Sequence, residues 1–545
     1  MRQRLVVKDG ALGRAWAKGL SAAAIGASAW LAVGTGVSGC AVSESDAHRW
    51  ETTENGPEKL YMVVTHDKYA WPLREEAALS LVRMKPRNGK RVGLEYLLVG
   101  FDTPLGRVQG ALAVLGDDAR RRIVDGITPK LLEKMRQPPP PKPAEGQPIV
   151  PDESVPYKDA AFAIISHEPP LASNEATKSE ISTELAKWVQ TDFEARIDNA
   201  TQQFGVEQIM RFLGPQSVKS LPSQINDDSS KVDAACRLLA DLGDDETKKR
   251  GSDALVVLAK HYDSQSWVDK QRGLAAEANK RANVKVTEAQ VNAQLAAYQE
   301  QELEKVFVDM KRLGGRPVVD FLIGFAADGK KSEKSRMTAL AALENRMDKN
   351  VPTDVARIME IVKDDASPDG VRALAMARLG ELPKEMIVSK LYTLFDKKWQ
   401  VRMEAGKMIL HTISTKELGE FFAHLPTNDK SKMGLSEPIT YGNVILQMDE
   451  KSVPKPREAL TPFLQSPMLG AKLTAIGSYY GGKKSEMSAL KGLEEDKQPV
   501  PKCEEKDGCG WSCDVPKAPG SQDKEPKTVA TVGEFIRYCI EPSGV

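Results

Sequence analysis

One short pattern recurs along this 545-residue chain: an arginine, an alanine three positions later, and a leucine or isoleucine four positions after that. In the C-terminal half, copies begin 36 residues (336 to 372) and 30 residues (372 to 402) apart. Alanine and leucine four positions apart share one face of an α-helix, and the small alanine lets a neighbouring helix approach. Units of about 30 to 40 residues cannot bury their apolar faces alone, so they stack. The copies are Arg74-Ala77-Leu81, Arg336-Ala339-Leu343, Arg372-Ala375-Leu379 and Arg402-Ala405-Ile409.

The arginine of each copy lies at the edge of the apolar face, where its guanidinium can reach a carboxylate or a loop carbonyl of the adjacent unit. We therefore expect Arg74, Arg336, Arg372 and Arg402 to form an inter-repeat series that shapes the array. Residues 229–262 have the same two-helix layout, but Asp233 occupies the arginine position, which leaves their contact between units open.

The best copies resemble HEAT repeats. Residues 367–382 (SPDGVRALAMARLGEL) match most closely, followed by KKWQVRMEAGKMIL, and both carry Val-Arg-x-x-Ala. The resemblance implies an all-α fold, an α-solenoid of HEAT-like helix pairs. Repeat arrays present a curved, extended surface that binds partners.

The clearest single helix lies between Thr287 and Gly314. Thr287 and Gln290 form a capping box at its start, Gly314-Gly315 ends it, and Pro317 opens the next helix. One face carries apolar residues at steps of three and four, which predicts that this face packs on the array. The residues of this face are Val291, Leu295, Tyr298, Val306, Met310 and Leu313.

A proline-rich segment, QPPPPKPAEGQPIVPDESVP, has eight prolines in twenty residues. Such a sequence favours extended polyproline II and acts as a spacer, so we expect it to separate an N-terminal helical unit from the main array. The expected layout is a signal peptide (1–39), a tether (40–55), an N-terminal HEAT-like unit (56–136), a proline-rich linker (137–156), a helical region with a HEAT-like pair and the long helix (157–315), the repeat array (316–500) and a cysteine-containing segment (501–545).

The N-terminus has the layout of a secretory signal: a basic start, then an apolar stretch rich in Ala, Gly and Ser. At its end, Val37-Ser38-Gly39-Cys40 resembles the lipobox of bacterial lipoproteins. The resemblance implies a lipid on Cys40, with three acyl chains as a stable membrane anchor. Ala41 follows in place of the aspartate that usually retains lipoproteins at the inner membrane, which favours the outer membrane of a Gram-negative envelope, on its periplasmic side.

Four of the six cysteines lie at the other end of the chain: Cys503, Cys509, Cys513 and Cys539. In an exported protein this even number predicts two disulfides that staple a small C-terminal segment, with three possible connectivities. A bond from Cys513 to Cys539 would hold the last helix. The alternative is a four-thiolate zinc site, although the gaps of five, three and twenty-five residues do not match paired C-x₂-C knuckles. Cys236 lies on an apolar helix face and is expected in the core.

The charge balance and motifs favour binding over catalysis. Removing residues 1–39 leaves 71 basic and 75 acidic residues. The chain therefore has no basic excess that would favour binding to nucleic acid.

Two Gly-x₄-Gly-Lys segments, 324–332 and 477–485, resemble a phosphate loop only in part. They have Lys331 and Lys484 where a phosphate loop needs Ser or Thr, and are interpreted as helix boundaries. We expect no catalytic residue and no cofactor. The predicted function is a lipid-anchored, protein-binding scaffold with an unidentified envelope partner; the alternatives are an accessory subunit of a lyase-like enzyme system and the zinc module.

Overall fold

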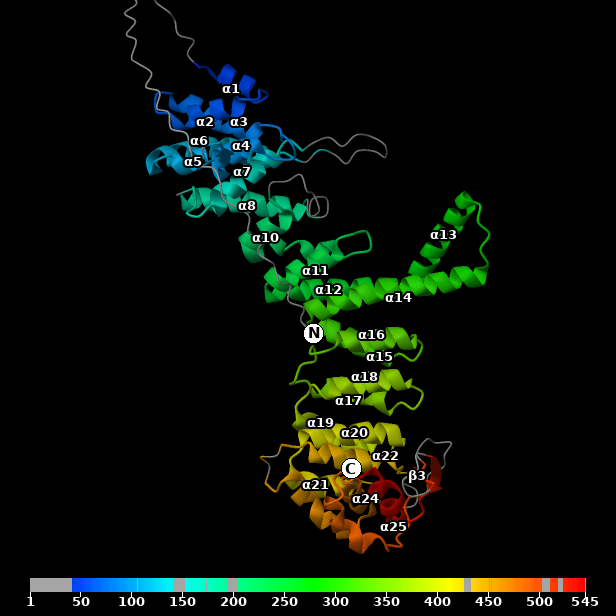
Figure 1. The fold of residues 1–545 in the computed structure, drawn as a ribbon. Coiled ribbons are helices and arrows are strands. Elements are labelled where there is room, and N and C mark those ends of the chain that lie inside the picture. The colour runs from blue at the N-terminus through cyan, green and yellow to red at the C-terminus, as the bar shows by residue number, and fades with distance from the viewer. Residues whose placement is uncertain are drawn as a thin grey trace, which may run out of the picture.

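The computed structural model describes residues 42–104, 106–138, 140, 152–172, 174–191, 193, 204–425, 433–449, 451, 453–501, 510–517 and 523–544. Its helices stack side by side into an elongated α-solenoid, with α1 at one end and the C-terminal helices at the other (Figure 1). The all-α fold expected from the repeats is confirmed, and the strands found in the described residues form two short hairpins.

The first third of the stack consists of helix pairs joined by short turns, with α2 packed on α3 and α3 on α6. A small antiparallel hairpin, β1–β2, pairs Phe101 with Val108. The elements are α1 Glu44–Trp50, α2 Gly56–Thr65, α3 Trp71–Arg83, α4 Val92–Leu94, η1 Glu95–Val99, β1 Phe101–Thr103, β2 Gly106–Val108, α5 Ala111–Val114, α6 Asp117–Met135, α7 Val155–Ser166, α8 Glu175–Thr191, α10 Val206–Leu213, η2 Gly214–Val218 and η3 Leu221–Gln224.

The prediction that residues 40–55 form a tether is wrong over Glu44–Trp50, which are helix α1. Ser43 caps this helix in a capping box with Asp46. Ala47 is fully buried, because α1 packs on α2 and α3. The stack therefore begins with the first residues that the structure describes.

The proline-rich linker does not separate two units as expected. Helices α6 and α7, on either side of it, pack directly against each other, and α7 begins at Val155, within the predicted linker. A buried ion pair of 2.9 Å between Arg91 and Asp159 joins α7 to the unit before the linker. The stack is thus continuous across residues 137–156, of which 139 and 141–151 lie outside the described residues.

The middle of the chain contains α11 Val232–Leu242, α12 Asp245–Tyr262, α13 Gln265–Ala282 and α14 Glu288–Leu313. The predicted capping box of Thr287 and Gln290 is present at the start of α14. Its C-terminal half packs on α11 and α12, whereas its N-terminal half leaves the stack together with α13 (Figure 1). We call residues 265–300 the arm.

A glycine pair turns the chain from α14 into α15. Gly314 and Gly315 have φ values of 69° and 93°, which side-chain-bearing residues rarely adopt. The hydroxyl of Ser252 on α12 donates to the carbonyl oxygen of Gly314 at 2.7 Å. This turn therefore fixes α14 to α12 and aligns the repeat array that follows.

The array consists of helix pairs in which the helix with the Arg-x-x-Ala motif follows its partner. Helices α14, α16 and α18 form one layer, and α12, α15, α17 and α19 form the other. The elements are α15 Arg316–Ala327, α16 Glu333–Ala342, α17 Pro352–Lys363, α18 Asp369–Leu379, α19 Lys384–Leu391, η4 Tyr392–Leu394, α20 Trp399–Thr412, η5 Thr415–Glu417, α21 Leu418–His424, α22 Ser436–Leu446, α23 Pro456–Leu460, η6 Thr461–Gln465, α24 Leu469–Gly477 and η7 Glu486–Leu493.

The C-terminal segment closes this end of the stack. An antiparallel hairpin of β3 Ser512–Pro516 and β4 Lys524–Thr528 precedes α25 Val532–Phe535, η9 Ile536–Ile540 and α26 Glu541–Ser543. Trp511 is buried, packs edge-on against Phe535, and donates its indole N–H to the carbonyl oxygen of Met433 at 2.8 Å. This cap covers the last apolar face of the array.

Candidate interaction surfaces

Two of the four repeat arginines make the same contact within their own helix pair. The Nε of Arg74 donates to the carbonyl oxygen of Val64 at 2.9 Å, and the Nε of Arg336 donates to that of Ala326 at 2.7 Å. Both carbonyls lie in the last turn of the preceding helix, where carbonyls lack intrahelical donors. Each arginine is only 3% exposed and so satisfies a buried helix end.

Two arginines also reach the adjacent unit. Arg336 donates from Nη2 to the hydroxyl of Ser367, just before α18, at 2.8 Å. Arg402 on α20 binds both carboxylate oxygens of Glu437 on α22, at 2.7 and 2.8 Å, and both residues are buried. Burial lowers the pKa of Arg402, but the hydrogen bonds and charge of Glu437 raise it by more. The pair forms a buried link between units.

The other two arginines of the predicted series are placed differently. Arg74 stacks on Trp71, with its guanidinium carbon 4.2 Å from the ring centroid. Arg372 pairs with Asp369 on its own helix and lies 3.9 Å from Asp365 in the preceding loop. Their contacts are therefore local, in contrast to those of Arg336 and Arg402.

Asp233 occupies the position of the motif arginine, and here the acidic residue takes that position while the arginine comes from a neighbouring helix. Arg312 on α14 donates from Nη1 to Asp233 on α11 at 2.6 Å and to Asp309 at 2.7 Å. Burial raises the pKa of Asp309 to about 6, against the opposing effect of Arg312. The neighbouring Cys236 is buried as expected, and burial raises the pKa of its thiol, which makes it unreactive.

A groove of 770 Å³ runs across three consecutive helices of one layer, α14, α16 and α18. Met337, Ala341 and Leu374 supply its apolar floor, and these side chains are exposed or half-buried. Glu304 and Lys334 are among the charged residues at its rim. The three apolar residues follow the motif arginines Arg336 and Arg372 by one to five positions, but the repeat pattern does not indicate that they remain uncovered.

Most residues of the arm are exposed. Of the 18 residues of α13, only Trp267 is buried, and it packs against Tyr262 and Tyr298. The predicted apolar face of α14 is buried at Leu295, Val306, Met310 and Leu313, whereas Tyr298 is 42% exposed. The face was therefore predicted correctly for the stack, whereas in the arm it is buried at Leu295 but not at Tyr298.

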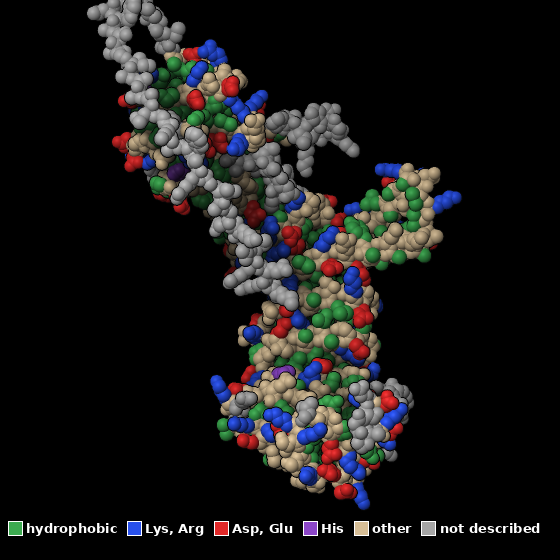
Figure 2. All heavy atoms as spheres, viewed as in Figure 1, with side chains coloured by type: hydrophobic (Ala, Val, Ile, Leu, Met, Phe, Trp, Pro, Cys, Tyr) green, Lys and Arg blue, Asp and Glu red, His purple; other side chains and the backbone are tan. Residues whose placement is uncertain are grey.

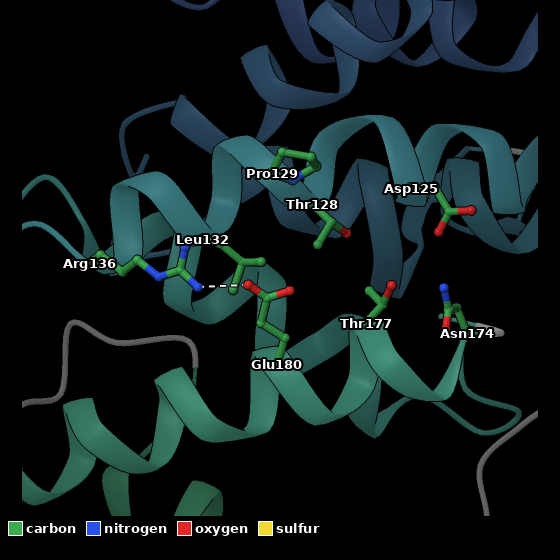
Figure 3. A pocket seen from close by; sticks show the side chains of 8 residues that line it. All are labelled: Asp125, Thr128, Pro129, Leu132, Arg136, Asn174, Thr177 and Glu180. Carbon is green, nitrogen blue, oxygen red and sulfur yellow. Dashed lines mark hydrogen bonds and ion pairs between the residues drawn. The ribbon is translucent and has the colours of Figure 1, made fainter.

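A second cavity, of 390 Å³, lies between α6 and α8, where polar side chains of both helices face each other (Figure 3). Arg136 crosses it and pairs with Glu180 at 2.7 Å. Asp125, Thr177 and Asn174 complete its polar lining. Its lining combines hydrogen-bond donors and acceptors, and the sequence did not indicate it.

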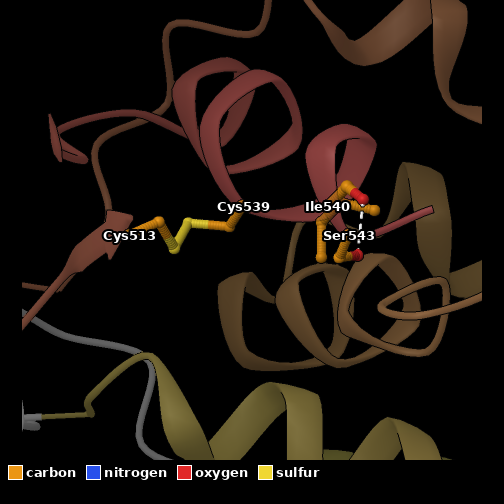
Figure 4. The surroundings of a disulfide bond; sticks show 4 residues. All are labelled: Cys513, Cys539, Ile540 and Ser543. Atoms are coloured by element: carbon orange, nitrogen blue, oxygen red, sulfur yellow. Dashed lines mark hydrogen bonds between the residues drawn. A yellow bond between two sulfur atoms is a disulfide. The ribbon is translucent and has the colours of Figure 1, made fainter. Parts of the chain in front are cut away.

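The disulfide from Cys513 to Cys539 joins β3 to η9 with a Cα–Cα distance of 5.4 Å (Figure 4). This bond confirms one predicted pair, and it excludes a site in which all four C-terminal cysteines hold zinc as thiolates. Cys503 and Cys509 lie outside the described residues, as do Cys40 and its lipobox.

The two Gly-x₄-Gly-Lys segments are helix boundaries, as expected. Gly324 lies within α15, and Ser332 caps α16 through the N–H of Ser335. Lys331 binds both oxygens of Asp263, at 2.6 and 2.8 Å. Gly477 is the last residue of α24. Neither segment follows a strand, so neither has the framework of a phosphate loop.

No group of three or more His, Cys, Asp or Glu side chains in the described ranges is arranged to hold a metal ion. No described helix combines the length and apolar character needed to cross a membrane.

No family model matches the sequence, and no curated protein does. Among solved structures, the chain is similar to Kap121p, with 11% identity and a TM-score of 0.29, over 83% of this chain and 41% of that one. It is also similar to importin beta, with 10% identity and a TM-score of 0.21 over 82% and 67%. A third is the RNA-binding domain of yeast Puf5p bound to AAT2 RNA, with 12% identity and a TM-score of 0.20 over 82% and 97%. The chain spans about two fifths of Kap121p.

Proposed function

We propose that this chain is a non-catalytic scaffold that binds other proteins along its helical array and is held in a bacterial cell envelope by a lipid on Cys40. The observation that carries the binding role is the groove across α14, α16 and α18, because a partly exposed apolar floor on α16 and α18 is bordered there by charged residues of α14 and α16. Exposed apolar surface rimmed by charge is typical of protein-binding sites. The buried groups with shifted pKa values, Asp309 and Arg402, serve helix packing rather than this groove.

The anchor follows from the lipobox and agrees with where the stack begins. Cys40 stands three positions before Ser43, the residue that caps α1. Three residues span at most about 10 Å. A lipid on Cys40 would therefore hold the first helices of the array at the membrane surface, with the rest of the stack available to an envelope partner. The residues after Cys40 favour the outer membrane, facing the periplasm.

The binding role is tested by disrupting the groove. Met337→Asp and Leu374→Asp place charges on its apolar floor at exposed or half-buried positions. We expect the wild-type chain to capture a defined set of envelope proteins that the double variant loses. Val257→Asp is the matched control, because Val257 on α12 is 68% exposed and lies outside the groove. Retention of the same partners by the groove variant would contradict the proposal.

The anchor is tested separately. Cys40→Ala removes the thiol that would carry the lipid, so the variant should no longer incorporate labelled fatty acid or partition into detergent with membrane lipoproteins. If the variant partitions like the wild type, the anchor is not on Cys40. This result would leave the groove experiment unaffected.

A further inference from the structure

The outer end of the arm combines positive charge with exposed apolar surface. We call residues 280–287 the tip; they contain Lys280, Arg281 and Lys285, and no acidic residue lies between Glu277 and Glu288. All three basic side chains are exposed, and Val284 between them is 54% exposed. Figure 2 shows the Lys and Arg side chains gathered at this end of the arm.

Neighbouring residues leave these charges almost unneutralised. The ion pair found at the tip among the described residues joins Arg281 to Glu277 at 3.6 Å, with side chains 83% and 69% exposed. An exposed pair of this kind contributes little. Lys280 and Arg281 also lie in the last turn of α13, where the helix dipole favours cations. The dipole does not account for Lys285 or Val284, which lie beyond the helix.

The position of the tip determines which kinds of surface can contact it. Helix α13 rises from α14 away from the stack, toward the end of the molecule that carries α1 (Figure 1). Asn283 ends α13 in a left-handed conformation with φ of 54°, and the chain then returns to α14. The tip is therefore presented outside the array, where a broad surface can reach it without contacting the helices of the stack.

We propose that the tip binds the surface of a bilayer containing anionic lipids, with the three cations at the phosphate groups and Val284 in the headgroup region. Charge complementarity identifies this partner: a small, fully hydrated basic cluster around one apolar side chain matches a negatively charged interface. The chain as a whole has no basic excess, so a general attraction of the whole protein to an anionic surface is not expected. The proposal adds a second membrane contact to the proposed lipid anchor, but its test does not depend on that anchor.

The test uses the unacylated chain from Ala41, which contains every described element, and sedimentation with vesicles. Binding is expected to vesicles of phosphatidylcholine with 30 mol% phosphatidylglycerol (on the order of the anionic content that attracts basic segments), and not to phosphatidylcholine alone. Binding should fall steeply as salt is raised. Replacing Lys280, Arg281 and Lys285 by glutamine should lower the partition coefficient by about 100-fold, since each basic residue contributes roughly fivefold.

Two further variants separate the tip from general charge effects. Lys483, Lys484 and Lys491 are exposed at the far end of the stack, so their replacement by glutamine makes the same change in net charge and should leave binding unchanged. Val284→Asp should weaken binding by an amount comparable to losing one or two of the cations. Equal binding to neutral vesicles, undiminished binding of the tip variant, or an equal loss in the far-end variant would each overturn the proposal. Failure of Cys40 lipidation would not affect any of these outcomes.

Discussion

Helices α18 and α13 are both regular helices, but their surroundings differ. In α18, six of eleven residues are buried, including Arg372, whereas in α13 only one of eighteen is. Helix α18 contacts both layers of the array, while α13 contacts mainly α14, around Trp267. The array therefore derives its stability from packing between units, and the arm mainly from helix propensity and a small cluster around Trp267.

This difference separates the residues that hold the fold from those that face partners. In the array, Arg336 and Arg402 are buried and donate to a carbonyl or a carboxylate. In the arm, charges such as those of Lys280 and Lys285 remain in solvent. Substitutions in the arm can alter binding while the stack stays folded.

The largest expected effect is the loss of the buried link between units. Arg402→Ala leaves the carboxylate of Glu437 buried without its partner, and we expect a loss of about 3–5 kcal/mol in the free energy of unfolding. Arg272→Ala is the counterpart in the arm: its pair with Asp269 has side chains 46% and 55% exposed. That variant should lose less than about 1 kcal/mol. Denaturant titration of both variants measures the contrast.

A second variant identifies the cause of the loss at Arg402. Arg402→Met combined with Glu437→Leu removes both charges and keeps apolar volume, so it should recover much of the stability that Arg402→Ala loses. If the double variant is as unstable as the single one, packing volume rather than the unpaired carboxylate explains the effect.

Helix α14 belongs to both the arm and the array. Asp309 lies in its buried half, and the titration of this side chain makes the stability of the packed stack depend on pH. Its pKa is raised from 3.8 to about 6 by burial, so the native state holds the proton more tightly than the unfolded state. The stability from this proton is present below pH 3.8 and is lost as the pH rises through 6. Arg312, Asp233 and Cys236 are the titratable or charged neighbours.

Asp309→Asn should therefore gain stability relative to the wild type as the pH rises. One pKa unit corresponds to about 1.4 kcal/mol, so the difference between variant and wild type should shift by about that amount from pH 5 to pH 8. Thermal unfolding of both proteins at the two pH values measures it. A difference that does not change with pH would show that Asp309 is ionised throughout this range.

Most of the stack could be predicted from the sequence, because each repeat carries its own periodicity. The motif and the capping box of Thr287 and Gln290 predicted the array and the start of α14. The arm could not be predicted, since Leu295 and Tyr298 continue the same apolar pattern although only Leu295 finds a neighbour that buries it. Periodicity indicates a face that can be buried but does not indicate what covers it.

Two predictions on connecting segments failed for a related reason. Residues 44–50 look polar and tether-like, yet Ala47 is fully buried and Trp50 packs against the core, so α1 docks on the stack. The prolines of residues 137–156 suggested a spacer, but α6 and α7 pack across it because their own apolar faces match. Composition describes a segment, whereas the neighbouring helices decide whether it separates two units. The contact of Arg312 with Asp233 likewise depends on two residues 79 positions apart.

The smallest expected effect is a change of glycine to alanine in the arm. A Cβ at Gly273 on α13 would meet nothing within 4 Å, so alanine there gains helix propensity at no steric cost. We expect α13 alone to be stabilised, by about 0.5–1 kcal/mol, visible as slower amide hydrogen exchange in that helix with an unchanged global unfolding transition. The same change at Gly406 in α20 puts the Cβ 2.5 Å from the ring of Tyr441, which is fully buried. That variant should lower global stability, as overpacking of a core does. If Gly273→Ala instead raised the stability of the whole chain, the arm would be coupled to the stack, and the division between a packed array and an independent arm would be wrong.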